Sequence, residues 1–457
     1  MSNIINVLQK PQFDNAIIRK EYHSYISYLQ SFQNNDEIRI SIQNQDLYVV
    51  PGESFLYIEG FATKADSTVS ASIKLLNNCI AHLFDEIRYE LNGIEIDRTR
   101  HLGIATEIKN YVSLNESESR NLVNAGWAPF NTDDLTLVSG YFNFCVPLKM
   151  LLGFAEDFDK IIVNAKHELI LLRSKDDTNV LKSIISSETC KLSILNITWK
   201  VPHIQLADVY KLQMLKVINN RQPLNISFRT WDMYYYPAVP SNTKVLWNVK
   251  LANENERPRF LLLGFKSSEK KFIHCDITNI KVHLNSDTYP YDDLNLKFDR
   301  NRFALLYDMY IKFQQSYYTR EPQPLLTREK FKGEAPIIVL DVTHQNETVK
   351  TGPIDIRIEL ETSKNISPNT SLYCLIIHDK MFEYIPLTNE YPCIGILNYP
   401  TTWTKTTGRS VSKVEMKEKP RLAKTLPSWR IQKRYLNPTC PKSTCRHNES
   451  LRETSIL

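Results

Sequence analysis

The chain has 457 residues, of which 42% are hydrophobic, 23% charged and 11% aromatic, and its formal net charge is +5. This composition is typical of a folded globular protein and excludes general disorder. No run approaches the roughly 18 apolar residues of a membrane helix, and residues 1–20 lack a secretion signal, so we expect an intracellular protein, cytoplasmic or nuclear, with no membrane span.

The N-terminal residues 1–36 fit two interpretations. A heptad-like spacing, as in a coiled-coil helix, relates five apolar side chains: Ile18, Tyr22, Tyr25, Leu29 and Phe32. The high content of Tyr and Ser suits an extended segment instead. We predict an N-terminal arm.

Strand patterns dominate the residues that follow. Residues 354–361 alternate apolar and charged side chains with a period of two, as in a strand with one face in a core and one in water. Phe142, Phe144, Val146 and Leu148 form a similar row. Residues 87–97 indicate two strands joined by a turn, because Asn92-Gly93 accepts the positive φ of a tight hairpin. The sequence therefore predicts antiparallel sheets.

Helical patterns are fewer and lie between blocks of strands. Residues 100–112 and 302–315 can each form a short amphipathic helix. Residues 208–219 can form a third, which ends before Pro223 and lies near the middle of the chain. We interpret this third helix as a connector between two domains.

Three short segments recur in the same order along the chain, at offsets of 184 to 193 residues. Each match alone is one that chance supplies in a strand-rich chain, but their common order and similar offsets indicate a duplication. One β-sandwich with a helix between its strands then occurs twice. The matching pairs are 48–51 with 236–240, 87–92 with 280–285, and 199–202 with 383–386.

Positive charge is concentrated at the C-terminal end. Residues 401–457 hold 13 Lys and Arg against 4 Asp and Glu, a net charge of +9, which leaves −4 for residues 1–400. Pro, Lys, Thr and Ser accumulate there without helix or strand periodicity, which predicts a basic, disordered tail. Its Trp403, Trp429 and Tyr435 lie among Lys and Arg, so a weak contact with nucleic acid through phosphates and stacking is one interpretation. A solvated terminus without a partner is the other.

Five segments carry a resemblance to a known family: 36–40 (DEIRI), 45–48 (QDLY), 51–60 (PGESFLYIEG), 84–97 (FDEIRYELNGIEID) and 146–154 (VPLKMLLGF). They resemble the double jelly-roll-like proteins of animal genomes. The last segment also resembles a short motif in major capsid proteins of large DNA viruses, virophages and Maverick/Polinton-type elements. The resemblance covers residues 36–395, and the tail after about Tyr399 departs from it.

The pattern and the resemblance together predict an all-β fold of two tandem antiparallel, eight-stranded jelly-roll sandwiches, with short helices between strands. We divide the chain into an N-terminal arm (1–36), a first jelly roll (37–205), a second jelly roll (206–400) and a basic, disordered tail (401–457).

The resemblance implies a structural capsid protein. Three chains would form a homotrimeric, pseudo-hexagonal capsomer, and capsomers would build a shell. The protein would be part of a virion if its element is still active, and viral, transposon-borne, endogenous and host-domesticated origins all stay open. In such an assembly the arm would reach a neighbouring chain or the inner face.

Motifs of nucleotide-binding and hydrolytic enzymes are missing from the sequence. It has no G-x-x-x-x-G-K-[ST], H-E-x-x-H or G-x-S-x-G, and only 12 glycines. We therefore assign no catalytic, cofactor-binding or metal-binding residue. We expect no enzymatic activity, no cofactor and no small-molecule substrate.

Two features imitate a metal or acid-base site. His167 begins an apolar run and has no second His at helical spacing, so a strand residue is the favoured interpretation. Cys440, Cys445 and His447 lie in the basic tail without a fourth zinc ligand, which argues against a structural zinc.

Two other features have structural interpretations that do not involve a functional site. The pairs Asp176-Asp177 and Asp292-Asp293 fit solvated turns better than a carboxylate dyad or a calcium site. The row Tyr234-Tyr235-Tyr236 fits a strand whose alternate rings pack inside one sandwich, with the others against the neighbouring roll. A carbohydrate or partner surface is the alternative for this row.

Two rival classes of function stay open. A non-viral β-sandwich binding or adaptor module would use its loops on a ligand and would be a monomer. A cupin-type enzyme would need clustered histidines and a carboxylate on facing strands. The 10 histidines are widely spaced, so this class ranks last.

Overall fold

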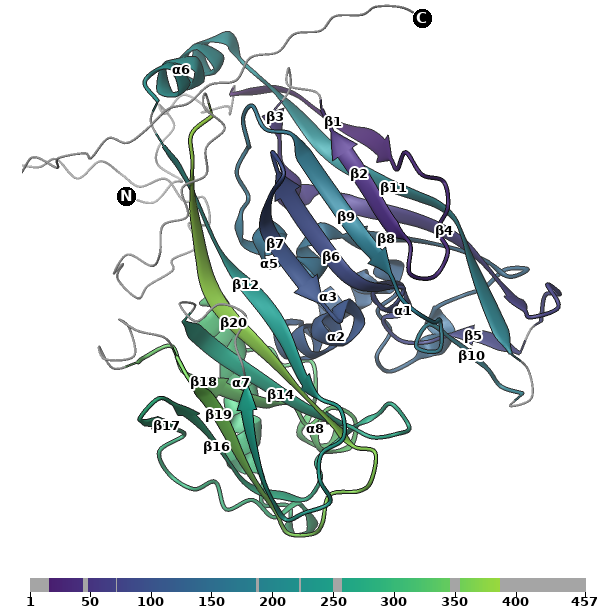
Figure 1. The fold of residues 1–457 in the computed structure, drawn as a ribbon, viewed down its shortest axis with the longest axis vertical. Helices are drawn as coiled ribbons and strands as arrows, with labels where there is room; N and C mark the ends of the chain where they lie inside the picture. Colours follow the sequence, from purple (N-terminus) through teal and green to yellow (C-terminus); the bar gives the residue numbers. More distant parts are fainter. Residues whose placement is uncertain are drawn as a thin grey trace, which may run out of the picture. The chain divides into compact units, whose positions relative to one another are not determined.

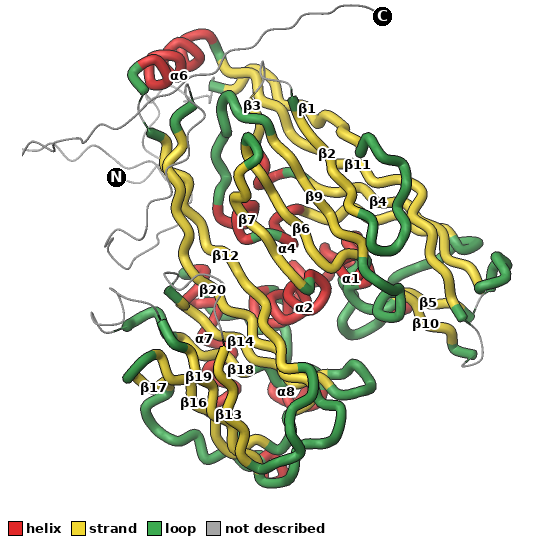
Figure 2. Tube along the Cα trace, viewed as in Figure 1, coloured by secondary structure: helices red, strands yellow, loops and turns green. Residues whose placement is uncertain are grey.

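The computed structural model describes residues 16–43, 48–70, 72–185, 189–221, 223–249, 257–345 and 354–386. Antiparallel strands are the most frequent element among these residues, and helices occur singly or in short pairs between them (Figures 1 and 2). This confirms the predicted fold class of two jelly-roll sandwiches. In the part of the chain that the structure describes, no helix is long and apolar enough to cross a membrane.

The first sandwich consists of two sheets with the strand orders β1-β11-β4-β8 and β2-β9-β6-β7. A short strand β3 (Tyr48–Val49) also pairs with β11, and β5 (Ile73–Leu75) pairs with β10 (Leu181–Ser183). The main strands are β1 (Ile17–Ile26), β2 (Glu37–Ile42), β4 (Phe55–Lys64), β6 (Phe84–Leu91), β7 (Ile94–Arg100), β8 (Tyr141–Pro147), β9 (His167–Arg173) and β11 (Cys190–Leu206).

The second sandwich repeats this arrangement with the orders β12-β20-β14 and β13-β19-β16-β17, while β15 and β18 both pair with β14. In β19 the apolar residues Ile356, Ile358 and Leu360 are buried and Arg357 is exposed, as the alternating pattern predicts. The strands are β12 (Leu224–Tyr236), β13 (Lys244–Val249), β14 (Pro258–Lys266), β15 (Phe272–Ile273), β16 (Ile277–Leu284), β17 (Asp287–Tyr289), β18 (Ile338–Asp341), β19 (Ile356–Thr362) and β20 (Ser371–Tyr384).

The two sandwiches correspond strand by strand. β6 and β16 hold the same place in their sheets, so the sequence match of 87–92 with 280–285 is confirmed. The segments 199–202 and 383–386 fall on strands with the same place, β11 and β20, but 199–202 lies inside β11 whereas 383–386 runs past the end of β20, so only the pairing of strands holds. The match of 48–51 with 236–240 is wrong. The first segment precedes β4, whereas the second follows β12 and precedes β13, which has the place of β2. Tyr and Pro are common where a strand ends in a turn. Two such segments can therefore look alike in sequence although they lie at different places in the fold.

An asparagine makes the same contacts in both sandwiches. Asn92 follows β6 with φ 50°, and Asn285 follows β16 with φ 53°. The backbone N–H of Lys166 donates to Asn92 Oδ1 (2.7 Å), and that of Asp355 donates to Asn285 Oδ1 (2.8 Å). Each asparagine N–H donates in return to the carbonyl of its partner. Asn tolerates this left-handed backbone conformation, so it can occupy the turn after the strand. Its two hydrogen bonds connect the turn to the residue just before the neighbouring strand, β9 in the first sandwich and β19 in the second.

The three predicted helices are present. α2 (Leu102–Ser113) follows β7, α7 (Ala304–Tyr318) follows β17, and α6 (Asp208–Asn219) joins β11 to β12 as the expected connector. The predicted strand row ends one residue early, because Leu148 begins a helix after Pro147. The other helices are α1 (Cys79–His82), α3 (Glu116–Asn121), α4 (Leu148–Leu151), α5 (Gly153–Asp157) and α8 (Arg328–Gly333), with 3-10 turns η2 (Pro51–Glu53), η3 (Leu122–Ala125), η4 (Thr132–Asp134) and η5 (Phe298–Arg300).

The described part of the predicted N-terminal arm is extended. Residues 17–26 form β1, which pairs with β11 of the same chain and takes the place in the first sandwich that β12 takes in the second. It is therefore an edge strand of that sandwich. The division of the chain at residues 36, 205 and 400 stays a prediction, and the tail, 401–457, lies outside the described residues.

Candidate functional site

A buried ion pair joins the two sandwiches. Arg229 lies on β12 of the second, and Asp157 ends α5 of the first. Arg229 Nε donates to Asp157 Oδ2 (2.7 Å), and a second guanidinium nitrogen donates to Oδ1 (2.6 Å). The side chains are only 9% and 6% exposed. Two parallel hydrogen bonds fix both distance and orientation, so this pair sets how β12 lies against α5.

A second buried pair lies beside it. Lys109 Nζ of α2 is 3.0 Å from both carboxylate oxygens of Glu156 and donates to the hydroxyl of Tyr318 at 2.9 Å. The hydroxyl of Tyr317 donates to Glu156 Oε2 (2.8 Å). The ammonium also lies 4.6 Å from the ring centroid of Trp231. We call Lys109, Glu156, Asp157, Arg229, Tyr317 and Tyr318 the joint cluster.

Charge compensation keeps the carboxylate of Glu156 ionised. Burial by itself would raise the pKa of Glu156, but Lys109 and Arg229 outweigh it and hold that pKa below its usual value. Burial lowers the pKa of Lys109, and Glu156 opposes this shift. Since each buried charge has a partner in reach, the desolvation that would otherwise disrupt such a site is offset.

Strand β7 contacts β12 through hydrogen bonds. Asp97 is fully buried, and its carboxylate accepts from the backbone N–H of Phe154 (2.8 Å) and from the hydroxyl of Thr230. Burial raises the pKa of Asp97. The indole N–H of Trp231 donates to Thr99 Oγ1 (2.9 Å). Three consecutive residues of β12, Arg229, Thr230 and Trp231, thus form hydrogen bonds with the first sandwich.

The two predicted inter-strand helices, α2 and α7, also contact each other where the two sandwiches meet. Tyr310 of α7 donates from its hydroxyl to the carbonyl of Tyr111 in α2 (2.9 Å). Gln314 donates to the carbonyls of Ser113 (3.2 Å) and Leu114 (3.1 Å). The last carbonyls of a helix have no partner within it. The second sandwich therefore caps the end of a helix of the first.

Gly153 allows this close approach. It lies in the segment 146–154 and begins α5. A Cβ atom there would lie 2.0 Å from the carbonyl oxygen of Arg229 and 3.1 Å from the Cα atom of Thr230. Since both obstacles are backbone atoms of β12, no side-chain movement could relieve the clash. Gly153 is thus the point at which β12 passes against α5.

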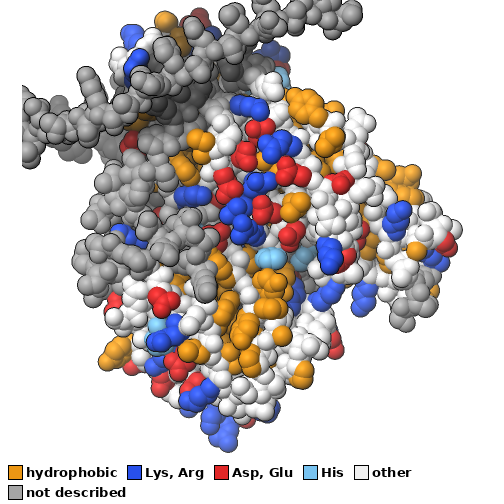
Figure 3. Space-filling model, viewed as in Figure 1, with side chains coloured by type: hydrophobic (Ala, Val, Ile, Leu, Met, Phe, Trp, Pro, Cys, Tyr) orange, Lys and Arg blue, Asp and Glu red, His pale blue; other side chains and the backbone are white. Residues whose placement is uncertain are grey.

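The outer face of the sheet β2-β9-β6-β7 is covered by ion pairs. Arg39 contacts Glu37 (3.2 Å) and Glu168 (3.6 Å), and Arg88 contacts Glu37 and Glu86 (both 3.1 Å). Figure 3 shows the mixed blue and red side chains over these strands. Charges of both signs compensate one another within the chain, so this face is hydrophilic. The participants are Arg39, Arg88, Arg98, Arg100, Lys166, Glu37, Glu86, Glu90, Glu95 and Glu168.

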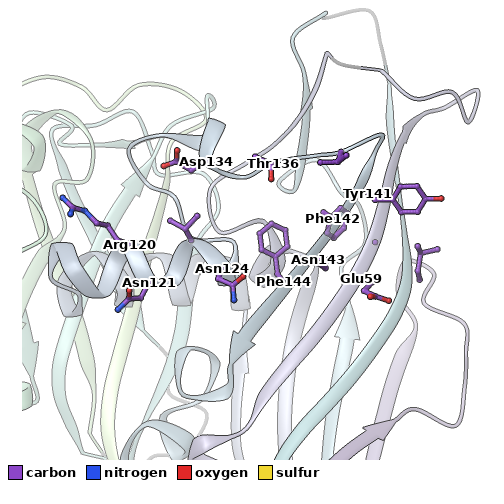
Figure 4. Close-up of a pocket in the computed structure, with 14 residues that line it drawn as sticks. Glu59, Arg120, Asn121, Asn124, Asp134, Thr136, Tyr141, Phe142, Asn143 and Phe144 are labelled. Atoms are coloured by element: carbon purple, nitrogen blue, oxygen red, sulfur yellow. The ribbon is translucent and has the colours of Figure 1, made fainter.

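A groove of about 810 Å³ runs beside β8. Figure 4 shows Phe142, Phe144 and Tyr141 on β8, and Asn121 and Asn124 on the helical segment that also lines the groove. Phe142 and Phe144 are buried while Tyr141 is exposed, and the residues that line the groove supply no nucleophile beside a base. Within the described ranges, no group of three or more His, Cys, Asp or Glu side chains could hold a metal ion.

Comparison with known proteins agrees with this geometry. Residues 73–382 match the double jelly roll-like domain family, which is more than half of the chain. The chain belongs to the double jelly roll-like domain family. A search of the curated proteins gives no match.

Solved capsid structures have the fold of this double jelly roll-like chain. PBCV-1 VP54, fitted into a reconstruction of the virophage Sputnik, matches with a TM-score of 0.52 at 10% identity, over 85% of this chain and 99% of VP54. The Faustovirus major capsid protein matches with a TM-score of 0.53 at 10% identity, over 83% and 92%. A chain of the Sputnik virophage matches with a TM-score of 0.53 at 9% identity, over 87% and 93%. At these identities the likeness is one of fold.

The features that imitated a site are structural in this double jelly roll-like protein. His167 is 1% exposed in β9, with Nδ1 2.6 Å from the hydroxyl of Tyr89, and burial lowers its pKa to about 3. It is a strand residue, as predicted. Asp177 pairs with Arg173 (2.8 Å) and Asp293 with Lys281 (2.6 Å).

The tyrosine row divides as the alternating pattern predicts. Tyr234 and Tyr236 are partly buried against the core, whereas Tyr235 is exposed. The ring of Tyr235 stacks on Tyr373 at 6.0 Å and contacts His101 of the first sandwich at 5.0 Å. Cys440, Cys445 and His447 lie outside the described residues.

The residues of the joint cluster were not singled out from the sequence. The sequence does contain one signal for Arg229, which lies between the apolar residues Phe228 and Trp231 of a strand. A charged side chain in an apolar strand either points into solvent or is buried with a partner of opposite charge. Lys109 lies likewise among buried residues of α2. The sequence could have marked these positions, but not their partners.

Proposed function

We propose that this chain is a capsid-type structural protein without enzymatic activity, which assembles with copies of itself into trimers. Its two similar sandwiches would give a trimer six similar blocks, which makes a pseudo-hexagonal capsomer. The observation that carries the proposal is the repeated strand order of the two sandwiches, joined through the joint cluster. A rigid block with large lateral surfaces is what closed, symmetric assembly requires.

The similarity to capsid proteins supports this proposal over its rivals. The comparisons do not favour a non-viral binding or adaptor module. Trimers would associate further into shells, and the protein would be found inside cells and in virions. A Maverick/Polinton-type, endogenous or domesticated origin stays a prediction. We keep the boundaries at residues 205 and 400 as part of the proposal, and we move the start of the first jelly roll from residue 37 back to β1 (Ile17–Ile26).

The oligomeric mass tests the proposal directly. We expect the purified full-length protein to have three times its monomer mass of 53.2 kDa in light scattering, and to form particles in negative-stain images at some salt concentrations. Burial of apolar area between chains would drive this association. A strict monomer at every concentration and salt condition would contradict it.

We propose that the basic tail, 401–457, makes a weak, sequence-independent contact with nucleic acid. Its net charge of +9 supports this, because neutralised phosphates release counterions. Removal of residues 401–457 should weaken binding of a DNA duplex at least about tenfold at low salt, and the affinity of the full chain should fall steeply as salt rises. Fluorescence anisotropy would measure both. Equal binding by the full and shortened chains would refute a contact through the tail.

A further inference from the structure

The outer face of the sheet β1-β11-β4-β8 differs from the charged face of the other sheet. On β4, Leu56 and Ile58 are buried in the core, whereas Phe55, Tyr57 and Phe61 are only partly buried on the opposite side. Neighbouring strands add exposed apolar side chains on that side. We call this surface the aromatic face, formed by Ile18, Tyr22, Ile26, Phe55, Tyr57, Phe61, Tyr141 and Leu195.

The aromatic face is continuous across its strands. The rings of Tyr22 on β1 and Phe55 on β4 lie 5.7 Å apart across β11, and those of Phe61 and Tyr141 lie 4.5 Å apart between β4 and β8. Its apolar side chains on β1, β8 and β11 are well exposed, for example Ile18 at 63% and Leu195 at 54%. Large apolar residues at this exposure, gathered on one sheet, indicate a surface that is covered in the functional state.

Three charged side chains of this face have a hydrogen-bond partner within the chain. Lys20 forms an ion pair with Glu53, and Lys200 Nζ donates to the hydroxyl of Ser24 (2.6 Å). The hydroxyl of Tyr57 donates to Glu59. Covering the face would therefore keep the ion pair of Lys20, whereas Lys200 and Glu59 each keep only a neutral hydroxyl partner, so the desolvation of these two charges opposes part of the gain from apolar burial.

The size of the face fits an interface between proteins. A ten-residue strand is about 33 Å long and four neighbouring strands are about 19 Å wide, which gives about 600 Å² of flat area. A standard interface buries about 800 Å² on each partner, so the face would make up most of one. The ion-paired face of the other sheet has no comparable apolar area, since its Arg and Glu side chains cover the strands.

We propose that the aromatic face packs against a second copy of this chain. The inference rests on the proposed self-assembly and names the surface that carries it. The contact buries Tyr22, Leu195 and Tyr141 of one chain against its neighbour. In a ring of three, the face meets a different surface of the next chain, because a three-fold interface is head-to-tail.

Two matched variants test the assignment. Leu195→Asp places a charge on the aromatic face, and Leu305→Asp makes the same change on α7 of the second sandwich, where the leucine is exposed to a similar degree, 58% against 54%. We expect Leu195→Asp to raise the dissociation constant of the oligomer by about 30-fold or more, as for the centre of an interface. Leu305→Asp should change it less than about threefold. Light scattering over a dilution series gives both values.

The outcomes separate the two proposals. If the wild type assembles and Leu195→Asp assembles equally well, or if both variants weaken assembly equally, the aromatic face is the wrong surface while self-assembly stands. If the wild type is a monomer throughout, self-assembly itself fails. Urea denaturation midpoints equal to that of the wild type show that the variants fold. Ile18→Asp near the start of β1 is the second variant, since its exposed side chain lies far from the core.

Discussion

Replacing Gly153 by alanine should destabilise the protein by about 3 kcal/mol or more, because one methyl group would have to displace backbone. The added Cβ atom would lie 2.0 Å from the carbonyl oxygen of Arg229 on the other sandwich. The backbone of Gly153 is not in the left-handed region, so alanine itself fits its conformation. The whole effect therefore reports the contact between α5 and β12. Urea denaturation of the purified variant measures it.

Gly333 provides the matched control for this change. It is the last residue of α8, and a Cβ atom there would have nothing within 4 Å. Gly333→Ala should leave stability unchanged or raise it by up to about 1 kcal/mol, because alanine restricts the unfolded chain and favours helix. Equal denaturation midpoints for the two variants would mean that β12 does not lie against Gly153.

Replacing Arg229 by methionine should destabilise the protein by about 3–5 kcal/mol, since Asp157 would stay buried without its cation. Asp157 accepts two hydrogen bonds from the guanidinium, and only the one from the Arg229 backbone N–H (2.9 Å) would remain. The methionine side chain keeps most of the apolar contacts of the arginine stem. The loss therefore measures the ion pair together with the guanidinium's contacts to the carbonyl and ring of Tyr317, again by urea denaturation.

Two further variants control for this result. Arg120→Met breaks an exposed pair with Glu116, whose side chains are 76% and 73% exposed, and should cost no more than about 0.5 kcal/mol. Arg229→Met combined with Asp157→Leu removes both buried charges and should recover much of the lost stability. A double variant no more stable than Arg229→Met alone would show that the two side chains do not act as a pair.

The segment 146–154 carries part of the resemblance and also part of the contact between the two sandwiches. From the sequence this segment only resembled a short motif of capsid proteins. In the structure its Gly153 and the next residues form α5, which carries Glu156 and Asp157 to the second sandwich. We infer that the motif records the contact between two sandwiches and not a binding site for a ligand.

The sequence by itself determined the features that depend on neighbouring residues. Alternation predicted β19, the spacing of apolar residues predicted α2, α6 and α7, and Asn92-Gly93 predicted a hairpin turn, because each signal lies within a few residues of its effect. Sequence matches also found β6 with β16 and β11 with β20 as repeated strands. The match of 48–51 with 236–240 failed because strand ends look alike in different places of a fold.

Only the tertiary structure decided which side chains meet. Arg229 and Asp157 are 72 positions apart, and Lys109 reaches Tyr318 across 209. A charged residue in a strand or helix has the same local pattern whether it faces water or a buried partner. The same holds for the two outer faces of the first sandwich, where one sheet presents ion pairs and the other aromatic rings. Such differences arise from contacts between distant segments, which create the burial and the charge partners that no local pattern contains.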